Sequence, residues 1–161
     1  MTDTADLDEG PVTASIAADL LSTEDLMDRL LAAASLEDYL DRYPTDTRSL
    51  ADYLACLLEE NGITKSQAIR RSGLGVTFAY QVFEGRRKVG RDNAIRLAFG
   101  LGASLRQTQR LLRLAGLSEL YCKVPRDAVV IYCVSHGASL QETEETLLRL
   151  GQAPLAPDGG R

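Results

Sequence analysis

The chain has 161 residues, of which 45% are hydrophobic and 25% charged, and its net charge is −5. This length suits one domain, or one domain with an additional subdomain, and the composition is that of a globular protein able to bury a core. No apolar run reaches the roughly 18 residues that span a bilayer, and the acidic N-terminus has no export signal, so we expect a cytoplasmic protein. The spacing of Cys56, Cys122 and Cys133 does not fit a metal site, and we expect reduced thiols.

The charges are divided unevenly along the chain. Residues 1–48 carry 12 acidic and 3 basic side chains, residues 49–126 carry 6 and 13, and residues 127–161 carry 5 and 2. A basic central segment between acidic flanks is typical of a nucleic-acid-binding module, although a chance clustering of solvated charges would give the same division.

The acidic N-terminal part predicts a polar, disordered tail at 1–12 and a helical arm at 13–48. Ser22 caps the first helix of the arm, and Ser35 begins a shorter one that ends before Pro44. The apolar stripe of the first helix consists of Leu26, Leu30, Leu31 and Ala34. We expect this stripe to pack on a neighbouring helix or a second subunit; the alternative is that the arm covers the basic segment and competes with a nucleic acid.

The basic segment predicts four further helices. They run from Ser49 to Asn61, over 65–72, from Val76 to Gly85 and over about 92–101. Thr64 caps the second of them, and Gly73 ends it. No stretch alternates with the period of a β-strand between turn signals, so the predicted fold class is all-α.

The C-terminal third contains an internal repeat with a period of 35 residues. Residues 91–116 match residues 126–151, beginning with Arg-Asp in both copies. Each copy has a helix, a Gly-Ala break, a capping Ser with Gln or Glu three residues later, and a second helix. A two-helix unit of this length cannot bury its apolar stripe alone. We therefore expect residues 105–152 to form a helical hairpin extension stacked on the bundle, followed by a disordered tail at 153–161.

A family resemblance rests on three stretches with uninterrupted spacing: ITKSQAIRRSG at 63–73, AYQVFEGRRK at 79–88 and LAFGLG at 97–102. They resemble the XRE (lambda-repressor-like, Cro-like) helix-turn-helix family, and the resemblance covers about residues 49–104. It implies a lambda-repressor-like helix-turn-helix bundle whose first helix crosses the DNA backbone and whose second enters the major groove. The function it implies is that of a bacterial, sequence-specific transcription regulator that binds double-stranded DNA as a homodimer.

The resemblance also implies which residues contact DNA. The candidates for base edges are Val76, Thr77, Tyr80 and Gln81. The candidates for phosphates are Lys65, Arg70, Arg71, Arg86, Arg87, Lys88 and Arg91. Gln81 can form two hydrogen bonds to adenine, and Val76 or Thr77 can contact a thymine methyl group. The inward-facing residues Ala79, Val82 and Phe83 would pack on Leu54, Ala68 and Leu97.

The sequence departs from the family pattern at Phe83, where Glu is frequent, and at Val89, where Pro is frequent. The second helix is also poor in the Arg, Asn and Gln residues that read bases. The alternative function is a protein-interaction adaptor that docks a partner protein through the acidic arm or through Phe78 and Tyr80, because exposed aromatic residues favour interfaces.

No residue pattern indicates an enzyme, a cofactor site or a metal site. His136, the single histidine, occupies the repeat position of Leu101 and is predicted to be half-buried and structural. The cysteines have no sequence partner that would make a nucleophile–base pair. The acidic clusters at 38–41 and 142–145 are interpreted as solvated helix faces. Leu111, Leu112, Leu147 and Leu148 are predicted to be core or interface.

Overall fold

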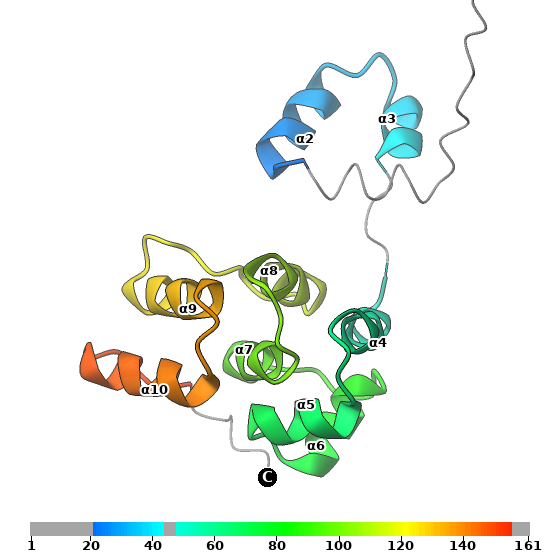
Figure 1. Ribbon diagram of the computed structural model, residues 1–161. Coiled ribbons are helices and arrows are strands. Elements are labelled where there is room, and N and C mark those ends of the chain that lie inside the picture. Colours follow the sequence, from blue (N-terminus) through cyan, green and yellow to red (C-terminus); the bar gives the residue numbers. More distant parts are fainter. Residues whose placement is uncertain (1–20, 44–47, 156–161) are drawn as a thin grey trace, which may run out of the picture. The chain divides into compact units, whose positions relative to one another are not determined.

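The computed structural model describes residues 21–43 and 48–155, and the regular elements in these ranges are all helices (Figure 1). The chain divides into two compact units, Met1–Thr47 and Arg48–Arg161. The prediction of an all-α chain is confirmed for the described ranges. None of the helices described there is long and apolar enough to cross a membrane.

The first unit contains α2 (Thr23–Leu31) and α3 (Leu36–Arg42), which contact each other. The hydroxyl groups of Ser22 and Ser35 each accept a hydrogen bond from the backbone N–H three residues later, at 3.0 and 3.1 Å, so both predicted caps are present. Neither helix has a buried residue, and Leu31 is 78% exposed. The apolar stripe of the arm is therefore not buried within this unit. The predicted tail at 1–12 lies outside the described residues.

The second unit contains the remaining helices. They are α4 (Leu50–Glu60), α5 (Lys65–Ser72), α6 (Val76–Phe83), α7 (Arg91–Gly100), α8 (Leu105–Leu114), α9 (Pro125–Ser135) and α10 (Leu140–Arg149). The predicted caps Ser49, Thr64, Ser104 and Ser139 all accept a hydrogen bond from the third backbone N–H of the helix. The predicted helix-turn-helix segment, residues 49–104, and the C-terminal hairpin both lie in this unit.

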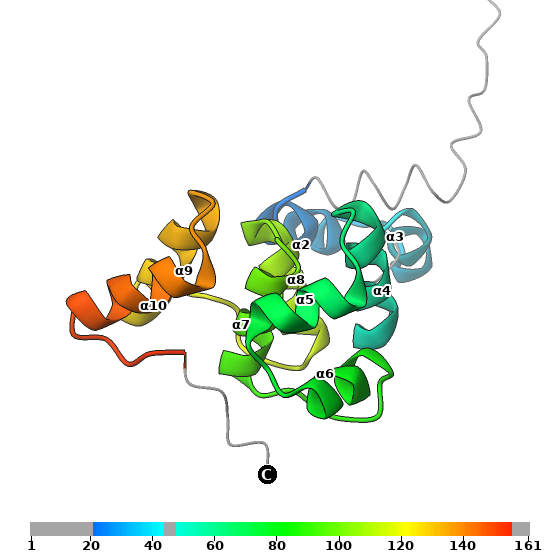
Figure 2. The same ribbon diagram turned by 60° about the horizontal axis from the view of Figure 1, so that its bottom comes forward.

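Helix α7 lies at the centre of the second unit, where it contacts α5, α8 and α10 (Figures 1 and 2). Leu97 in this helix and Leu101 directly after it are fully buried. At Gly100 the helix approaches α5 so closely that an added Cβ would overlap the carbonyl oxygen of Ala68 and lie 3.0 Å from the backbone nitrogen of Ser72. The absence of a side chain at Gly100 therefore sets the distance between α5 and α7.

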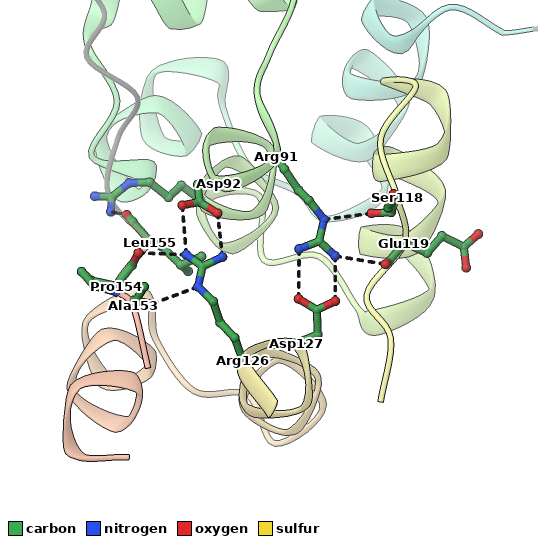
Figure 3. A network of polar contacts seen from close by, with 10 residues as sticks. Arg91, Asp92, Ser118, Glu119, Arg126, Asp127, Ala153, Pro154 and Leu155 are labelled. Carbon is green, nitrogen blue, oxygen red and sulfur yellow. Dashed lines mark hydrogen bonds and ion pairs between the residues drawn. The ribbon is translucent and has the colours of Figure 1, made fainter. Parts of the chain in front are cut away.

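Two reciprocal ion pairs join the two copies of the repeat (Figure 3). The guanidinium group of Arg91 donates to both carboxylate oxygens of Asp127, at 2.9 and 2.8 Å, and that of Arg126 donates to both oxygens of Asp92, at 2.9 Å each. Arg91 also donates to the carbonyl oxygens of residues 118 and 119, and Arg126 to those of residues 153 and 154, which lie 35 positions later. Each arginine thus binds two backbone carbonyl groups just after its own copy and a carboxylate at the start of the other copy.

This exchange gives the copies an approximate two-fold relation. Under a two-fold axis a contact from residue i to residue j is matched by a contact from j to i, whereas a stack repeats each contact in one direction. The helix contacts follow the same rule, because α7 packs on α10 and α8 packs on α9. The two hairpins thus pack on each other in this reciprocal arrangement, a geometry that the sequence did not specify.

Two expectations for the C-terminal part are wrong. Residues 153–155 do not belong to a disordered tail, because Leu155 is fully buried and Arg126 binds the two carbonyl groups before it; residues 156–161 lie outside the described part. His136 is exposed, stacked on Tyr132 with ring centroids 3.9 Å apart. Leu111, Leu112 and Leu147 are buried in the core, one of the two predicted locations, and Leu148 is 75% exposed, so for Leu148 an interface stays a prediction.

Candidate functional site

The helix pair α5 and α6 is joined by a three-residue turn, residues 73–75. Thr64 and Gln67 form a reciprocal capping box at the start of α5, in which the Thr64 Oγ1 accepts from the Gln67 N–H at 3.2 Å. Gly73 ends α5 with a φ of 68°, a left-handed conformation that glycine adopts without the strain imposed by a Cβ. No side chain caps the start of α6.

Helix α6 has one buried face and one exposed face. Ala79, Val82 and Phe83 are buried in the same core cluster as Leu54, Ala68 and Leu97, as predicted. Among the base-edge candidates, Val76 is 62% exposed and Tyr80 38% exposed; Thr77 is exposed and Gln81 half-buried. The four candidates therefore share the outward side of a short helix whose inner side is fixed in the core.

Cationic side chains are frequent in the segments before and after α6. Arg70, Arg71 and Lys88 are exposed, and none has an ion-pair partner in the described part of the chain. Lys65 is half-buried, and its Nζ lies 5.8 Å from the ring centroid of Tyr80 and 5.7 Å from that of Phe83. Residues 61–83 contain no Asp or Glu, so the positive potential of α5 is not neutralised along the chain.

The loop after α6 carries two cations that make local contacts. Arg87 lies over the ring of Phe78, with its guanidinium carbon 5.5 Å from the centroid, and its Nη1 donates a long hydrogen bond of 3.5 Å to the Gln81 amide oxygen. Arg86 forms an ion pair with Glu84, in which both side chains are largely exposed. Exposed pairs of this kind are weak, so a phosphate group can compete for Arg86.

Arg91 does not belong to this surface. Its guanidinium group makes four hydrogen bonds within the repeat, two of them to Asp127, and only 27% of its side chain is exposed. We therefore remove Arg91 from the predicted phosphate contacts. The sequence contains a signal for this role, since Arg91-Asp92 recurs as Arg126-Asp127 and each arginine binds the aspartate of the other copy.

A small hollow lies between α5 and α6. It has a volume of about 280 Å³, just below the ~300–1,000 Å³ of typical small-molecule sites. Its lining residues are Ser66, Ile69, Arg70, Leu74, Val76 and Tyr80. With mostly apolar walls and one arginine, it suits a methyl group or a ring edge beside an anion.

The described residues were also compared with the requirements of a metal site and of a buried polar site. No group of three His, Cys, Asp or Glu side chains among them could hold a metal ion. Every buried side-chain nitrogen and oxygen atom in these ranges has a hydrogen-bond partner, so none is left pointing into an empty site. The three cysteines are free thiols, of which Cys122 is exposed, Cys56 half-buried and Cys133 buried.

Comparisons with protein-family models, with curated proteins and with solved structures gave no match to this chain. The functional interpretation therefore rests on the geometry and charge of α5, α6 and the loop that follows them.

Proposed function

We propose that this protein is a transcription regulator that binds double-stranded DNA as a homodimer, with α6 in the major groove. The observation that carries the proposal is the position of α6, whose inner side is held in the core while Val76, Thr77 and Tyr80 are exposed and Gln81 is half-buried. Arg70, Arg71 and Lys88 in the neighbouring segments have no ion-pair partner among the described residues. A major groove about 12 Å wide admits one α-helix, and Thr77 and Gln81 would then face base edges.

Phosphate contacts would come from both sides of α6. Lys65, Arg70 and Arg71 lie on α5, and residues 86–88 lie in the loop beyond α6. The uncapped start of α6 adds free backbone N–H groups at the positive end of the helix dipole, which favours an anion. Contacts of this kind fix the orientation of a protein on the duplex without reading its sequence.

The test is a titration of a duplex at several salt concentrations with wild-type protein and a triple variant, Arg86→Ala, Arg87→Ala and Lys88→Ala. Each lost phosphate contact is expected to reduce the slope of log K against log salt by roughly 0.9. The matched control removes three cations of the C-terminal part of the chain, Arg113, Lys123 and Arg149. An equal change of slope in both triple variants would show that only net charge matters and would contradict the assignment.

A second candidate function, docking of a partner protein, is favoured by exposed apolar side chains. Tyr80 and Val76 are exposed on α6, and Met27, Leu31 and Leu36 are more than half exposed in the acidic first unit. An adaptor of this kind would not need the cations of α5. Wild-type protein that binds no duplex at low salt, where phosphate contacts are strongest, would favour the adaptor.

A further inference from the structure

Arg96 is a buried arginine that links the α5–α6 turn to the second copy of the repeat. Only 9% of the residue is exposed. Its Nε donates to the carbonyl oxygen of Ser72 at 3.0 Å, and its Nη1 donates to the Glu144 carboxylate at 2.5 Å and to the carbonyl oxygen of Leu155. One guanidinium group therefore connects the end of α5, helix α10 and the last described residue.

The guanidinium group lies directly against the turn. Ser72 is the last residue of α5, and its carbonyl group is one of those that a helix end leaves without an intrahelical partner. A Cβ added at Gly73 would lie 2.7 Å from Nη2 of Arg96. A cation at the negative end of a helix is favourable. Arg96 thus holds both the last carbonyl of α5 and the first residue of the turn that leads into α6.

The link is not required by the hairpin itself. The repeat position of Glu144 is Gln109, whose amide bonds directly to the backbone of Leu120, at 2.9 Å to its oxygen and 2.7 Å from its nitrogen. The repeat position of Arg96 is Ile131. The first copy therefore closes with a neutral glutamine, whereas the second uses a carboxylate and an arginine that reaches the turn. The ion pair is a departure from the repeat.

We propose that Glu144 and Arg96 are positioning residues through which the second copy of the repeat fixes the α5–α6 turn and the orientation of α6. Glu144 holds the guanidinium group, the guanidinium group holds Ser72 and Gly73, and these residues set where α6 begins. The consequence for recognition rests on the proposed function: with a loose turn, phosphate contacts persist but the side chains of α6 no longer meet base edges in one register.

The experiment compares Glu144→Gln with Asp92→Asn in the full chain. Glu144→Gln installs the residue that the first copy uses, and Asp92→Asn removes one negative charge from the same joint between the copies without touching the turn. The first readout is amide hydrogen exchange at Gly73 and Leu74, whose N–H groups bond to Arg70 O and to Ser72 Oγ. We expect Glu144→Gln to speed exchange at these two amides about tenfold, and Asp92→Asn to leave them unchanged relative to the rest of the unit.

The second readout is the ratio of affinities for a duplex selected with wild-type protein and for an unrelated duplex. Glu144→Gln is expected to lower this ratio about tenfold with an unchanged salt slope, because phosphate contacts remain. Equal exchange at Gly73 and Leu74 in the two variants would overturn the positioning role. Faster exchange in a protein that binds no duplex would keep the positioning role and reject the proposed function instead.

Discussion

The carboxylate of Asp127 lies in the joint between the two copies of the repeat and is 4% exposed. Burial favours its neutral form, but hydrogen bonds from Arg91 and from the N–H of Tyr121, together with the charges of Arg91 and Arg126, outweigh burial and hold the pKa of Asp127 below its usual value. The hydrogen bond with Asp127 raises the pKa of Arg91. Both side chains of the pair are therefore charged at neutral pH.

Replacing Asp127 with Ala is expected to lower the free energy of unfolding by about 3 kcal/mol, because Arg91 would keep a largely buried charge without its partner. Urea unfolding at neutral pH measures this change. The control is Glu119→Ala, which breaks an ion pair with Arg113 whose side chains are 56% and 43% exposed and which should cost less than about 1 kcal/mol. Equal losses in the two variants would contradict a structural role for the buried pair.

The same carboxylate predicts an acid-sensitive part of the stability. Its folded pKa lies below the unfolded value of about 3.9, so its contribution is fully present above that value and is lost as pH falls through the folded pKa. The difference in unfolding free energy between wild type and Asp127→Asn should therefore be constant at neutral pH and shrink in acid. A difference that does not vary down to pH 2 would show that the carboxylate charge is not involved.

Thr77 and Gln81 are expected to read bases, since both lie on the outward side of α6. Replacing either with Ala should change the preferred base at one position, with about 1–3 kcal/mol lost for a bidentate contact, and alter unfolding by less than about 0.5 kcal/mol. Binding-site selection with each variant measures the preference. The control is Gln141→Ala, which replaces an exposed residue of α10. Uniformly weaker binding with an unchanged preference would make these residues positioning contacts only.

At the scale of elements, the approach of α5 to α7 depends on a missing side chain. Gly100→Ala would force the two helices apart, because the new Cβ meets the backbone of α5, and overpacking of this kind costs about 1–3 kcal/mol. Gly75→Ala is the control, since nothing lies within 4 Å of its Cβ position and its φ of −58° suits alanine. Thermal unfolding of both variants checks the prediction, and a Gly100→Ala protein as stable as wild type would contradict it.

The helices were predictable because their signals are local. Thr64, Gln67 and Gly73 lie within one helix and its ends, and the capping chemistry that they indicate is the chemistry observed. The inner face of α6 was predictable for the same reason, since burial follows the helical period. The exposure of the base-edge candidates is consistent with their predicted role, but a contact with DNA is not a property of the chain alone.

The role of Arg91 and the exposure of His136 were not predictable in the same way. A basic residue after α6 looks the same in sequence whether its partner is a phosphate or a carboxylate 36 residues later. His136 matches Leu101 in the repeat. Leu101 is buried in a core to which α4, α5 and α6 contribute. Among the described helices, the second copy is not preceded by three helices equivalent to α4, α5 and α6. Both errors come from contacts that are set by the arrangement of whole elements.

At the scale of the whole molecule, the two-fold relation predicts how one copy alone would behave. A chain ending at Leu120 keeps Arg91 and Asp92 but loses their partners, and the same pair on a second chain offers complementary ones. We expect this truncated protein to dimerise in sedimentation experiments, and Asp92→Arg to return it to a monomer by placing like charges together. A folded, monomeric truncated protein at high concentration would show that the exchanged pairs do not suffice for association.

Because the two copies belong to one chain, their association does not depend on the protein concentration. Between α8 and α9 the connection spans only residues 115–124, so each copy meets the other at an effective concentration in the millimolar range, whatever the amount of protein in the cell. Two separate hairpins with the same contacts would dissociate when their concentration in the cell fell. The clamp of Arg91 and Arg126 is instead closed in every molecule, and only a second, intermolecular interface would respond to protein level.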